Sequence, residues 1–217
     1  MKVGTDAVLL GAWVSTTGTK RILDVGTGSG IIALMLAQRT RENVNIDGIE
    51  IAEADVKQAQ QNLEETRWCN RVLIHHCSLQ NFQSPFRYDL IVSNPPFFIN
   101  SQLPPAAHRA KARHTQSLSY QELLHHSVKL LKKSGRLAVI LPYEEGNQFL
   151  LLANKHSLFC IRQLAFYSRN AKPQERWLFE FSFAEKPLIE EKLTLHGEGE
   201  SWSVEYKNLT HDFYLKS

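Results

Sequence analysis

The sequence predicts an α/β fold built around a mostly parallel sheet, and three observations support this prediction. Short apolar runs alternate with helical periods from residue 21 to residue 141, which is typical of successive βαβ units. A glycine-rich segment follows the first apolar run and precedes a helical period. Apolar residues make up 43% and charged residues 22% of the chain, a globular composition that excludes a disordered or fibrous protein.

Five strands and three helices are expected in the parallel part of the sheet. The expected strands are residues 21–25, 44–49, 72–76, 89–93 and 137–141. The expected helices, in which apolar residues recur with a period of about 3.6, are residues 31–37, 52–66 and 119–132. Because helices alternate with strands, the strands are expected to run parallel through right-handed crossovers.

The C-terminal part has a different pattern. Residues 159–167 and 177–184 are two expected strands joined by a polar segment without a helix, so they should pair antiparallel. A further hairpin is expected from residues 193–195 and 202–206, because two glycines lie between these runs.

A single domain is expected, because 217 residues are about 1.4 times the ~150 residues of a typical domain. Its cofactor half is expected at about residues 1–93, and its catalytic and substrate half at about residues 94–217. At the junction, residues 94–117 lack a clear period and hold four of the eight prolines. A segment this long without secondary structure in a compact domain usually carries function.

The net charge of +3 is too small to indicate a partner, but the charge is unevenly distributed. Residues 101–136 contain seven basic side chains and one acidic one, so this window carries +6 and the rest of the chain −3. The basic stretch from Arg109 to His114 has a composition that suits contacts with nucleic-acid phosphates. A solvated charged loop would have the same composition, and the residues alone leave both interpretations open.

The cysteines and apolar runs indicate the compartment. Cys69, Cys77 and Cys160 form no CxxC pair, which favours a reducing compartment over a disulfide framework or a zinc knuckle. The apolar run at residues 7–14 has Asp6 at its edge and no small-residue cleavage site after it, so secretion is not expected. No run approaches the ~18 apolar residues of a membrane span. We therefore expect a cytoplasmic protein without a membrane partner.

The glycine-rich segment predicts a nucleoside site. Gly26, Gly28 and Gly30 alternate after a strand that carries Asp24, a spacing that differs from the GxGxxG of NAD sites. No Lys-Ser or Lys-Thr follows, so a Walker-type phosphate cradle is excluded. Glu50 ends the second expected strand, about where a carboxylate holds ribose hydroxyls. An adenosyl ligand without phosphates, with a positive ammonium end near Asp24, fits these residues best.

The fourth expected strand runs into Asn94-Pro95-Pro96-Phe97, at the sheet edge where open α/β folds bind ligands. The Asn94 side-chain oxygen and the Pro95 carbonyl oxygen can accept hydrogen bonds from the two N–H groups of an exocyclic amine. This favours the pyramidal nitrogen that attacks a methyl sulfonium. The prolines fix the backbone, and Phe97 can stack on a planar substrate.

Residues 22–30 resemble the first motif of the class I S-adenosylmethionine-dependent methyltransferases. A longer resemblance is to the bacterial tRNA (adenine-37-N6)-methyltransferases that modify a valine tRNA. The residues that carry it are 1–13, 94–98, 109–114, 173–176 and 209–215, and it covers essentially the whole chain. It implies a Rossmann-like fold with a mostly parallel seven-stranded sheet, helices on both faces and a C-terminal antiparallel hairpin. It also implies S-adenosylmethionine as cofactor, a tRNA substrate and no metal, and we favour a monomer.

The resemblance assigns roles to three sets of residues. Cofactor binding is assigned to Thr5, Asp6, Asp24, Gly26, Thr27, Gly28, Gly30, Glu50, Ser78 and Asn94. Catalysis is assigned to Asn94, Pro95, Pro96 and Phe97. Substrate binding is assigned to Phe97, Arg109, Lys111, Arg113 and His114. In the first set, Thr5 and Asp6 pack beside the methionine end of the cofactor.

Two features depart from the family pattern. Family members carry a short, typically aromatic and basic segment before the motif that starts at Lys2, and this sequence starts at the motif. The third strand of this class usually ends in an aspartate that contacts the adenine amino group of the cofactor. Cys77-Ser78 stands in its place, so Ser78 is expected to make a weaker contact or to leave it to the backbone.

Other functions stay open on the motif alone. Asn-Pro-Pro-Phe/Tyr also serves methyltransferases that act on guanine N2 of rRNA, on adenine of DNA or on protein glutamine. The rRNA enzymes usually carry a second, degenerate domain and the glutamine enzymes a helical N-terminal domain, for which 217 residues leave no room. From a different class, a catalytically idle RNA-binding module is the alternative.

Overall fold

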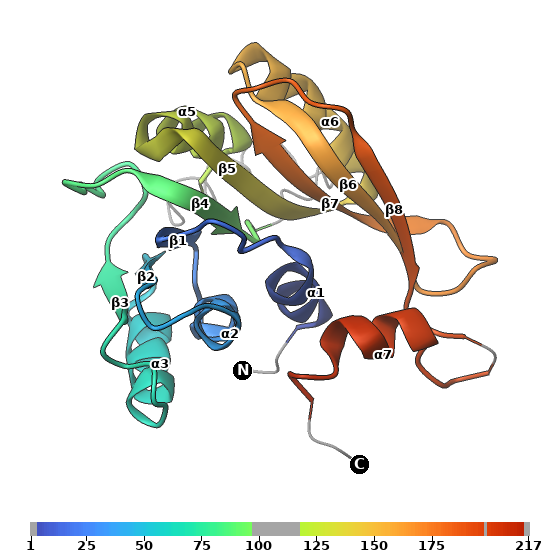
Figure 1. Ribbon diagram of the computed structural model, residues 1–217, viewed down its shortest axis with the longest axis horizontal. Coiled ribbons are helices and arrows are strands. Elements are labelled where there is room, and N and C mark those ends of the chain that lie inside the picture. The colour runs from blue at the N-terminus through green and yellow to red at the C-terminus, as the bar shows by residue number, and fades with distance from the viewer. Residues whose placement is uncertain (1–3, 97–117, 198, 215–217) are drawn as a thin grey trace, which may run out of the picture.

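A computed structural model describes residues 4–96, 118–197 and 199–214 of the 217 residues. Within these ranges eight strands form one sheet, in the order β3-β2-β1-β4-β5-β7-β6-β8. Helices cover both faces of this sheet (Figure 1). This is the doubly wound arrangement that the alternating pattern predicts.

Five strands form the parallel half of the sheet. They are β1 (Arg21–Val25), β2 (Asn45–Glu50), β3 (Val72–His76), β4 (Tyr88–Ser93) and β5 (Leu131–Pro142). The strand order reverses between β1 and β4, which are neighbours in the sheet but not in the chain. In open α/β sheets the crevice outside the carboxyl ends at such a point is where ligands bind.

Three further strands extend the sheet. They are β6 (Phe159–Tyr167), β7 (Gln174–Ser182) and β8 (Ile189–Thr194). Strand β7 pairs antiparallel with both β5 and β6, which confirms the expected C-terminal hairpin. Strand β8 pairs parallel with β6 at the sheet edge. It makes the sheet one strand larger than the seven expected.

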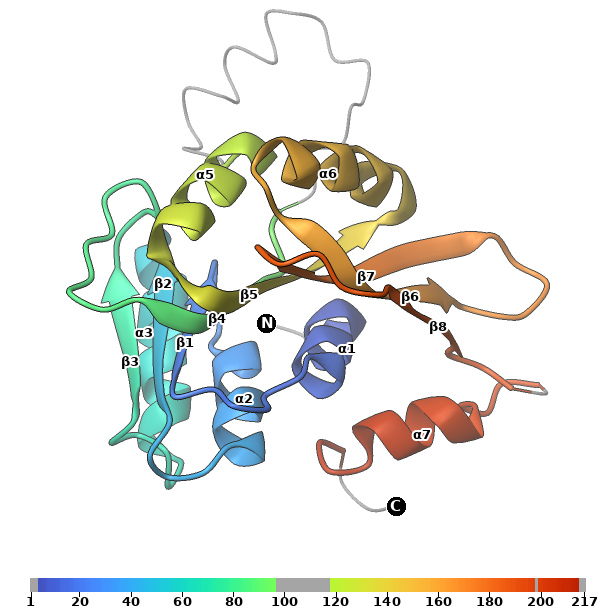
Figure 2. The same ribbon diagram turned by 45° about the horizontal axis from the view of Figure 1, so that its top comes forward.

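Two layers of helices pack on the sheet. One layer contains α1 (Thr5–Trp13), α2 (Ile31–Arg39), α3 (Glu53–Glu64) and α7 (Val204–Thr210). The other contains α5 (Tyr120–Leu130) and α6 (Tyr143–Lys155) (Figure 2). The start of α5 is set by a capping box, in which Ser119 and Glu122 satisfy each other's main-chain N–H groups.

The prediction that residues 202–206 form the second strand of the last hairpin is wrong. Helix α7 begins within this run because the Ser203 side chain accepts a hydrogen bond from the main-chain N–H of Tyr206 at 3.0 Å, an N-cap contact. Only an isolated bridge joins His196 and Trp202. No helix of the described segments is long and apolar enough to cross a membrane.

Candidate active site

The loops that follow β1 and β4 start side by side at the carboxyl edge of the sheet. Val25 and Ser93 are paired in the register of the two strands. The buried Ser93 hydroxyl also donates a hydrogen bond to the Val25 carbonyl oxygen at 2.9 Å. The residues that come next, Gly26 and Asn94, therefore open the glycine loop and the Asn-Pro-Pro motif at neighbouring positions.

The glycine loop turns sharply over the end of β2. The main-chain N–H groups of Gly26 and Thr27 both donate to the Ile49 carbonyl oxygen, each at 3.0 Å. Gly26, Gly28 and Gly30 all have positive φ angles (70°, 54° and 82°), which L-residues with side chains rarely adopt. At Gly26 and Gly28 the space where a Cβ would stand is open, with no heavy atom within 4 Å. This side of the loop can be approached closely by a ligand.

Asp24 is the most deeply buried carboxyl group of the site, with no exposed surface. Its Oδ2 accepts a hydrogen bond from the Thr27 hydroxyl at 2.6 Å. Its Oδ1 is buried and has no hydrogen-bond partner among the described residues. Burial raises the pKa of Asp24 to about 7, although the Thr27 hydrogen bond opposes the shift. A cation placed near this carboxyl would favour its charged form.

Glu50, at the end of β2, holds the glycine loop in position. Its Oε2 accepts a hydrogen bond from the Gly28 N–H at 3.0 Å. Its Oε1 accepts from the N–H groups of Ile51 at 2.8 Å and Ala52 at 3.0 Å. A carboxylate has about four lone-pair sites, so acceptor capacity is left for hydroxyl groups of a ligand. Glu50 thus lies where sequence reasoning expected it and has a structural role as well.

Ser78 lies beside Glu50 at the same edge. The main-chain N–H of Cys77 donates to the Glu50 carbonyl oxygen at 3.0 Å and so continues the pairing of β3 with β2. Ser78 follows directly and is 8% exposed. Its position matches the one usually held by an aspartate, but its hydroxyl carries no charge and has a shorter reach.

Asn94, the first residue of the Asn-Pro-Pro motif, lies next to the glycine loop and carries a hydrogen-bond acceptor without a partner among the described residues. This acceptor is the side-chain Oδ1, which is buried. Pro95 next to it is buried and Pro96 is exposed. An orphaned buried acceptor costs free energy unless a donor reaches it, so this position suits an N–H donor of a bound molecule.

The rest of the expected site lies outside the described residues. This applies to Phe97, which directly follows Pro96, and to the basic stretch with Arg109, Lys111, Arg113 and His114. Their roles in catalysis and substrate binding stay predictions from the sequence.

Thr5 and Asp6 form the first turn of α1. Thr5 is exposed, and Asp6 forms an ion pair with Arg176 of β7, with Asp6 Oδ2 2.9 Å from Arg176 Nε. Arg176 is paired in register with Pro142 at the carboxyl end of β5. This ion pair connects α1 to the carboxyl edge of the sheet at β5 and β7. Sequence reasoning cited Arg176 only within a motif and missed this contact, which joins residues 170 positions apart.

The described site fits S-adenosylmethionine by its donor and acceptor set. Open space lies over the glycine loop, and the carboxyl groups of Asp24 and Glu50 can face the positive and the hydroxyl-bearing parts of such a ligand. The acceptor of Asn94 lies next to this space and suits an amine. Among the described residues, no three His, Cys, Asp or Glu side chains group as a metal site would require.

Comparisons with a family model and with solved structures identify the class of fold. Residues 3–154 match the family described as "Methyltransferase small domain". A predicted O-methyltransferase from Agrobacterium tumefaciens has a TM-score of 0.73 at 15% identity, covering 95% of this chain and 96% of that one. A putative RNA methyltransferase from Pyrococcus horikoshii has a TM-score of 0.56 at 16% identity, covering 81% and 80%. At these identities the likeness shows the fold alone.

Curated relatives match over nearly the full length. The tRNA1(Val) (adenine(37)-N6)-methyltransferase of Trichodesmium erythraeum is 46% identical and covers 100% of this chain and 92% of its own. Proteins of the same name from Bacteroides thetaiotaomicron and Tolumonas auensis are each 41% identical, covering 99% and 100% of this chain and 91% of their own.

The fold and the glycine-loop site define a Rossmann-like methyltransferase, which confirms the fold class expected from the sequence. The matches over nearly the whole chain are more specific. The chain belongs to the family of the tRNA1(Val) (adenine(37)-N6)-methyltransferases. This confirms the resemblance inferred from the motifs.

Proposed function

We propose that the chain transfers the methyl group of S-adenosylmethionine to the exocyclic N6 of adenine-37 in a valine tRNA. The observation that carries the proposal is the buried, unpartnered Oδ1 of Asn94 next to the open side of the glycine loop. The names of relatives at 41–46% identity support the substrate.

On the cofactor side, bound S-adenosylmethionine supplies an electrophilic methyl group on a sulfonium. The chain holds this ligand at four places. Glu50 accepts hydrogen bonds from the ribose hydroxyls while it fixes the loop through Gly28. Asp24 faces the ammonium end from within the core, and Ser78 lies at the adenine end. The first turn of α1, with Thr5 and Asp6, closes the methionine end.

On the substrate side, the chain's task is to align an amine that is a poor nucleophile. The lone pair of an exocyclic amine is delocalised into the base. Asn94 Oδ1 and the Pro95 carbonyl oxygen accept its two N–H groups and favour the pyramidal nitrogen. With the amine held in this way, bound S-adenosylmethionine would supply the methyl group to the nitrogen, S-adenosylhomocysteine would leave, and the displaced proton would pass to water. Acceptors fixed before the reaction stabilise the transition state without reorganisation.

Two further roles rest on the sequence. Phe97 stacks on the adenine once it leaves the RNA stack, as enzymes that modify bases require. The basic residues Arg109, Lys111 and Arg113, together with His114, contact the phosphates next to the target. Because tRNA is the substrate, we place the activity in the cytoplasm. We propose that the chain acts there as a monomer without a metal.

A substrate exchange tests this function. Valine tRNA transcripts with adenine or guanine at position 37 are incubated with the chain and methyl-labelled S-adenosylmethionine. The proposal predicts label only in the adenine-37 transcript, and N6-methyladenosine after digestion. Equal labelling of both transcripts, or N2-methylguanosine in the digest, would favour methylation of another base amino group. Label in protein alone would favour methylation of protein glutamine.

A further inference from the structure

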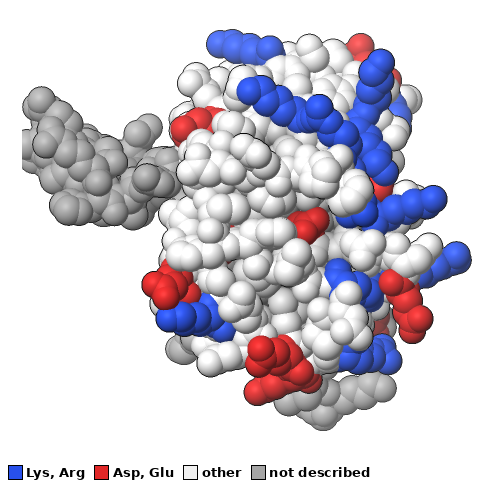
Figure 3. Space-filling model, turned by 90° about the vertical axis from the view of Figure 1, so that its left-hand side faces the viewer, with Lys and Arg blue, Asp and Glu red and all other residues white. Residues whose placement is uncertain are grey.

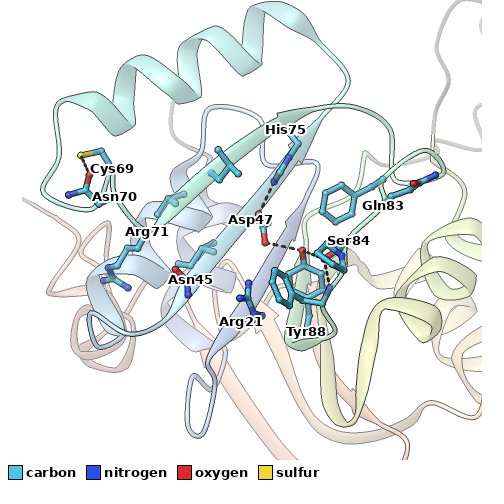
Figure 4. Close-up of a pocket in the computed structure, with 16 residues that line it drawn as sticks. Arg21, Asn45, Asp47, Cys69, Asn70, Arg71, His75, Gln83, Ser84 and Tyr88 are labelled. Carbon is cyan, nitrogen blue, oxygen red and sulfur yellow. Dashed lines mark hydrogen bonds and ion pairs between the residues drawn. The ribbon is translucent and has the colours of Figure 1, made fainter.

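A groove lies at the amino edge of the sheet, on the side away from the candidate active site. Its volume is about 480 Å³, and it is lined by the starts of β1, β2 and β3 and by the connection between β3 and β4 (Figure 4). That connection, residues 77–87, contains no described helix, so part of the α5 and α6 face of the sheet stays uncovered. Leu73 and Phe86 are 58% and 47% exposed as a result.

The floor of the groove is polar and already organised. Asp47 is the one acidic residue among its lining residues, and its carboxylate has two partners: His75 Nε2 lies 2.7 Å from Oδ1, and the Tyr88 hydroxyl donates to Oδ2 at 2.9 Å. Phe82 packs edge-on against the His75 ring. These two contacts fix the orientation of the Asp47 carboxylate on the floor of the groove.

The rim presents a cation stacked on an aromatic ring. The Arg21 guanidinium lies 3.5 Å from the centre of the Phe86 ring. A guanidinium plane held on a ring is a stacking platform for a nucleic-acid base, and it carries the charge that a phosphate needs. The groove therefore combines the two features by which proteins bind unpaired nucleotides.

More positive charge continues along the neighbouring strand starts. The strands β1, β4 and β5 are adjacent in the sheet, and their amino ends bring Lys20, Arg87 and Lys133 to the same edge. All three are exposed and have no ion pair with a described residue. Figure 3 shows Lys and Arg gathered along the right-hand edge of this side of the molecule.

One acid at this edge, Asp89, is paired with a lysine. It forms an ion pair with Lys132 at 2.7 Å and accepts the main-chain N–H groups of Lys20 and Arg21, each at 2.9 Å. Burial alone would raise the pKa of Asp89, but these hydrogen bonds hold it below its ordinary value. Lys20, Arg87 and Lys133 thus keep their charges free of ion pairs with described residues, while Glu42 adds an exposed acid near Arg71.

We infer that this groove and its basic rim form a second RNA-binding surface, which takes an unpaired nucleotide of the substrate tRNA away from the methylated position. The inference rests on the proposed function for the identity of the RNA. Strand β1 has five residues and spans only about 17 Å, so an RNA arm longer than the strand can contact both edges of the sheet.

RNA binding by single variants tests this surface. Fluorescence anisotropy with labelled valine tRNA is measured at several salt concentrations for the wild type, Phe86→Ala, Phe86→Tyr and Arg21→Ala. The control is Lys207→Ala, which removes one exposed cation from α7. Phe86→Ala should weaken binding about 5- to 100-fold and Phe86→Tyr should restore it, as expected for stacking. Arg21→Ala should reduce the salt slope by about one unit. Lys207→Ala should leave both unchanged.

Two outcomes would overturn the inference. One is wild-type affinity and salt slope in both Phe86→Ala and Arg21→Ala, with S-adenosylmethionine affinity showing that the variants are folded. The other is a loss of tRNA affinity in Lys207→Ala equal to that in Phe86→Ala and Arg21→Ala. If the variants lose RNA affinity while the wild type leaves adenine-37 unmethylated, the surface stands and the proposed function fails.

Discussion

The hydroxyl of Ser93 donates a hydrogen bond to the carbonyl oxygen of Val25 at 2.9 Å, across the point where the strand order reverses. The two residues are 68 positions apart, and each directly precedes a loop of the proposed site. This contact sets the glycine loop against the Asn-Pro-Pro motif. It explains why the open side of the glycine loop and the unpartnered Oδ1 of Asn94 occur together at this edge.

Removing this hydrogen bond should cost stability. Ser93→Ala would leave the buried Val25 carbonyl without its side-chain donor, and losing one partner of a buried hydrogen bond costs about 1–3 kcal/mol. Urea unfolding measures the difference. The matched control is Ser127→Ala, because the Ser127 hydroxyl is buried without a hydrogen-bond partner among the described residues. If Ser127→Ala costs as much as Ser93→Ala, the hydrogen bond is not the cause.

The stability of the protein should depend on pH through Asp24. Its folded-state pKa, about 7, lies above the ordinary value of 3.8, because burial disfavours the charge. The contribution of the protonated Asp24 carboxyl to the free energy of unfolding is therefore complete below about pH 4. This contribution is lost as pH rises toward 7. Asp24→Asn cannot ionise, so the melting temperature of the wild type should fall relative to this variant between about pH 4 and pH 7 and then level off. Parallel curves for the two proteins would show that Asp24 does not titrate in this range.

Glu50 should contribute to cofactor binding beyond its hold on the loop. Charge-assisted hydrogen bonds are worth about 1.5–3 kcal/mol, so Glu50→Ala should raise the Kd for S-adenosylmethionine about 10- to 100-fold in calorimetry. The control is Glu53→Ala, which removes an exposed carboxylate in the first turn of α3 that forms an ion pair with Lys57. An unchanged Kd in Glu50→Ala would remove this residue from the cofactor site.

The basic stretch should act on RNA and not on the cofactor. Replacing Arg109, Lys111 and Arg113 together by alanine should lower the salt slope of tRNA binding by about 0.7–0.9 for each phosphate that the variant no longer neutralises. The affinity for S-adenosylmethionine should stay the same. A salt slope equal to that of the wild type would leave the amino-edge groove as the main electrostatic contact.

Much of the fold could be predicted because the parallel strands are short apolar runs that alternate with helical periods. Residues 21–25 and 72–76 match β1 and β3. Helix α1 was missed because all of its residues from 7 to 13 are buried, so the run shows no amphipathic period. The segment from Trp202 to Tyr206 alternates like a strand, but the side chain of Ser203 starts a helix there.

The site also contains residues that could be predicted from the sequence and contacts that could not. The positions of Asp24, Glu50 and Asn94 could be predicted because each lies at or next to the carboxyl end of a parallel strand, and such ends meet at one edge. The contacts Ser93–Val25 and Asp6–Arg176 could not, since they join segments 68 and 170 residues apart and leave no local pattern. The amino-edge groove could not be predicted from the sequence either, because it forms where the connection between β3 and β4 contains no helix to cover the sheet.

The most direct test of the account is the single-turnover rate of methyl transfer to valine tRNA by Asn94→Ala. If the buried Oδ1 of Asn94 accepts the amine as its nitrogen becomes pyramidal, the interaction is made mainly in the transition state. The account predicts a loss of about 100-fold or more in rate, with the Kd values for tRNA and S-adenosylmethionine nearly unchanged. A rate within a few-fold of the wild type would contradict it.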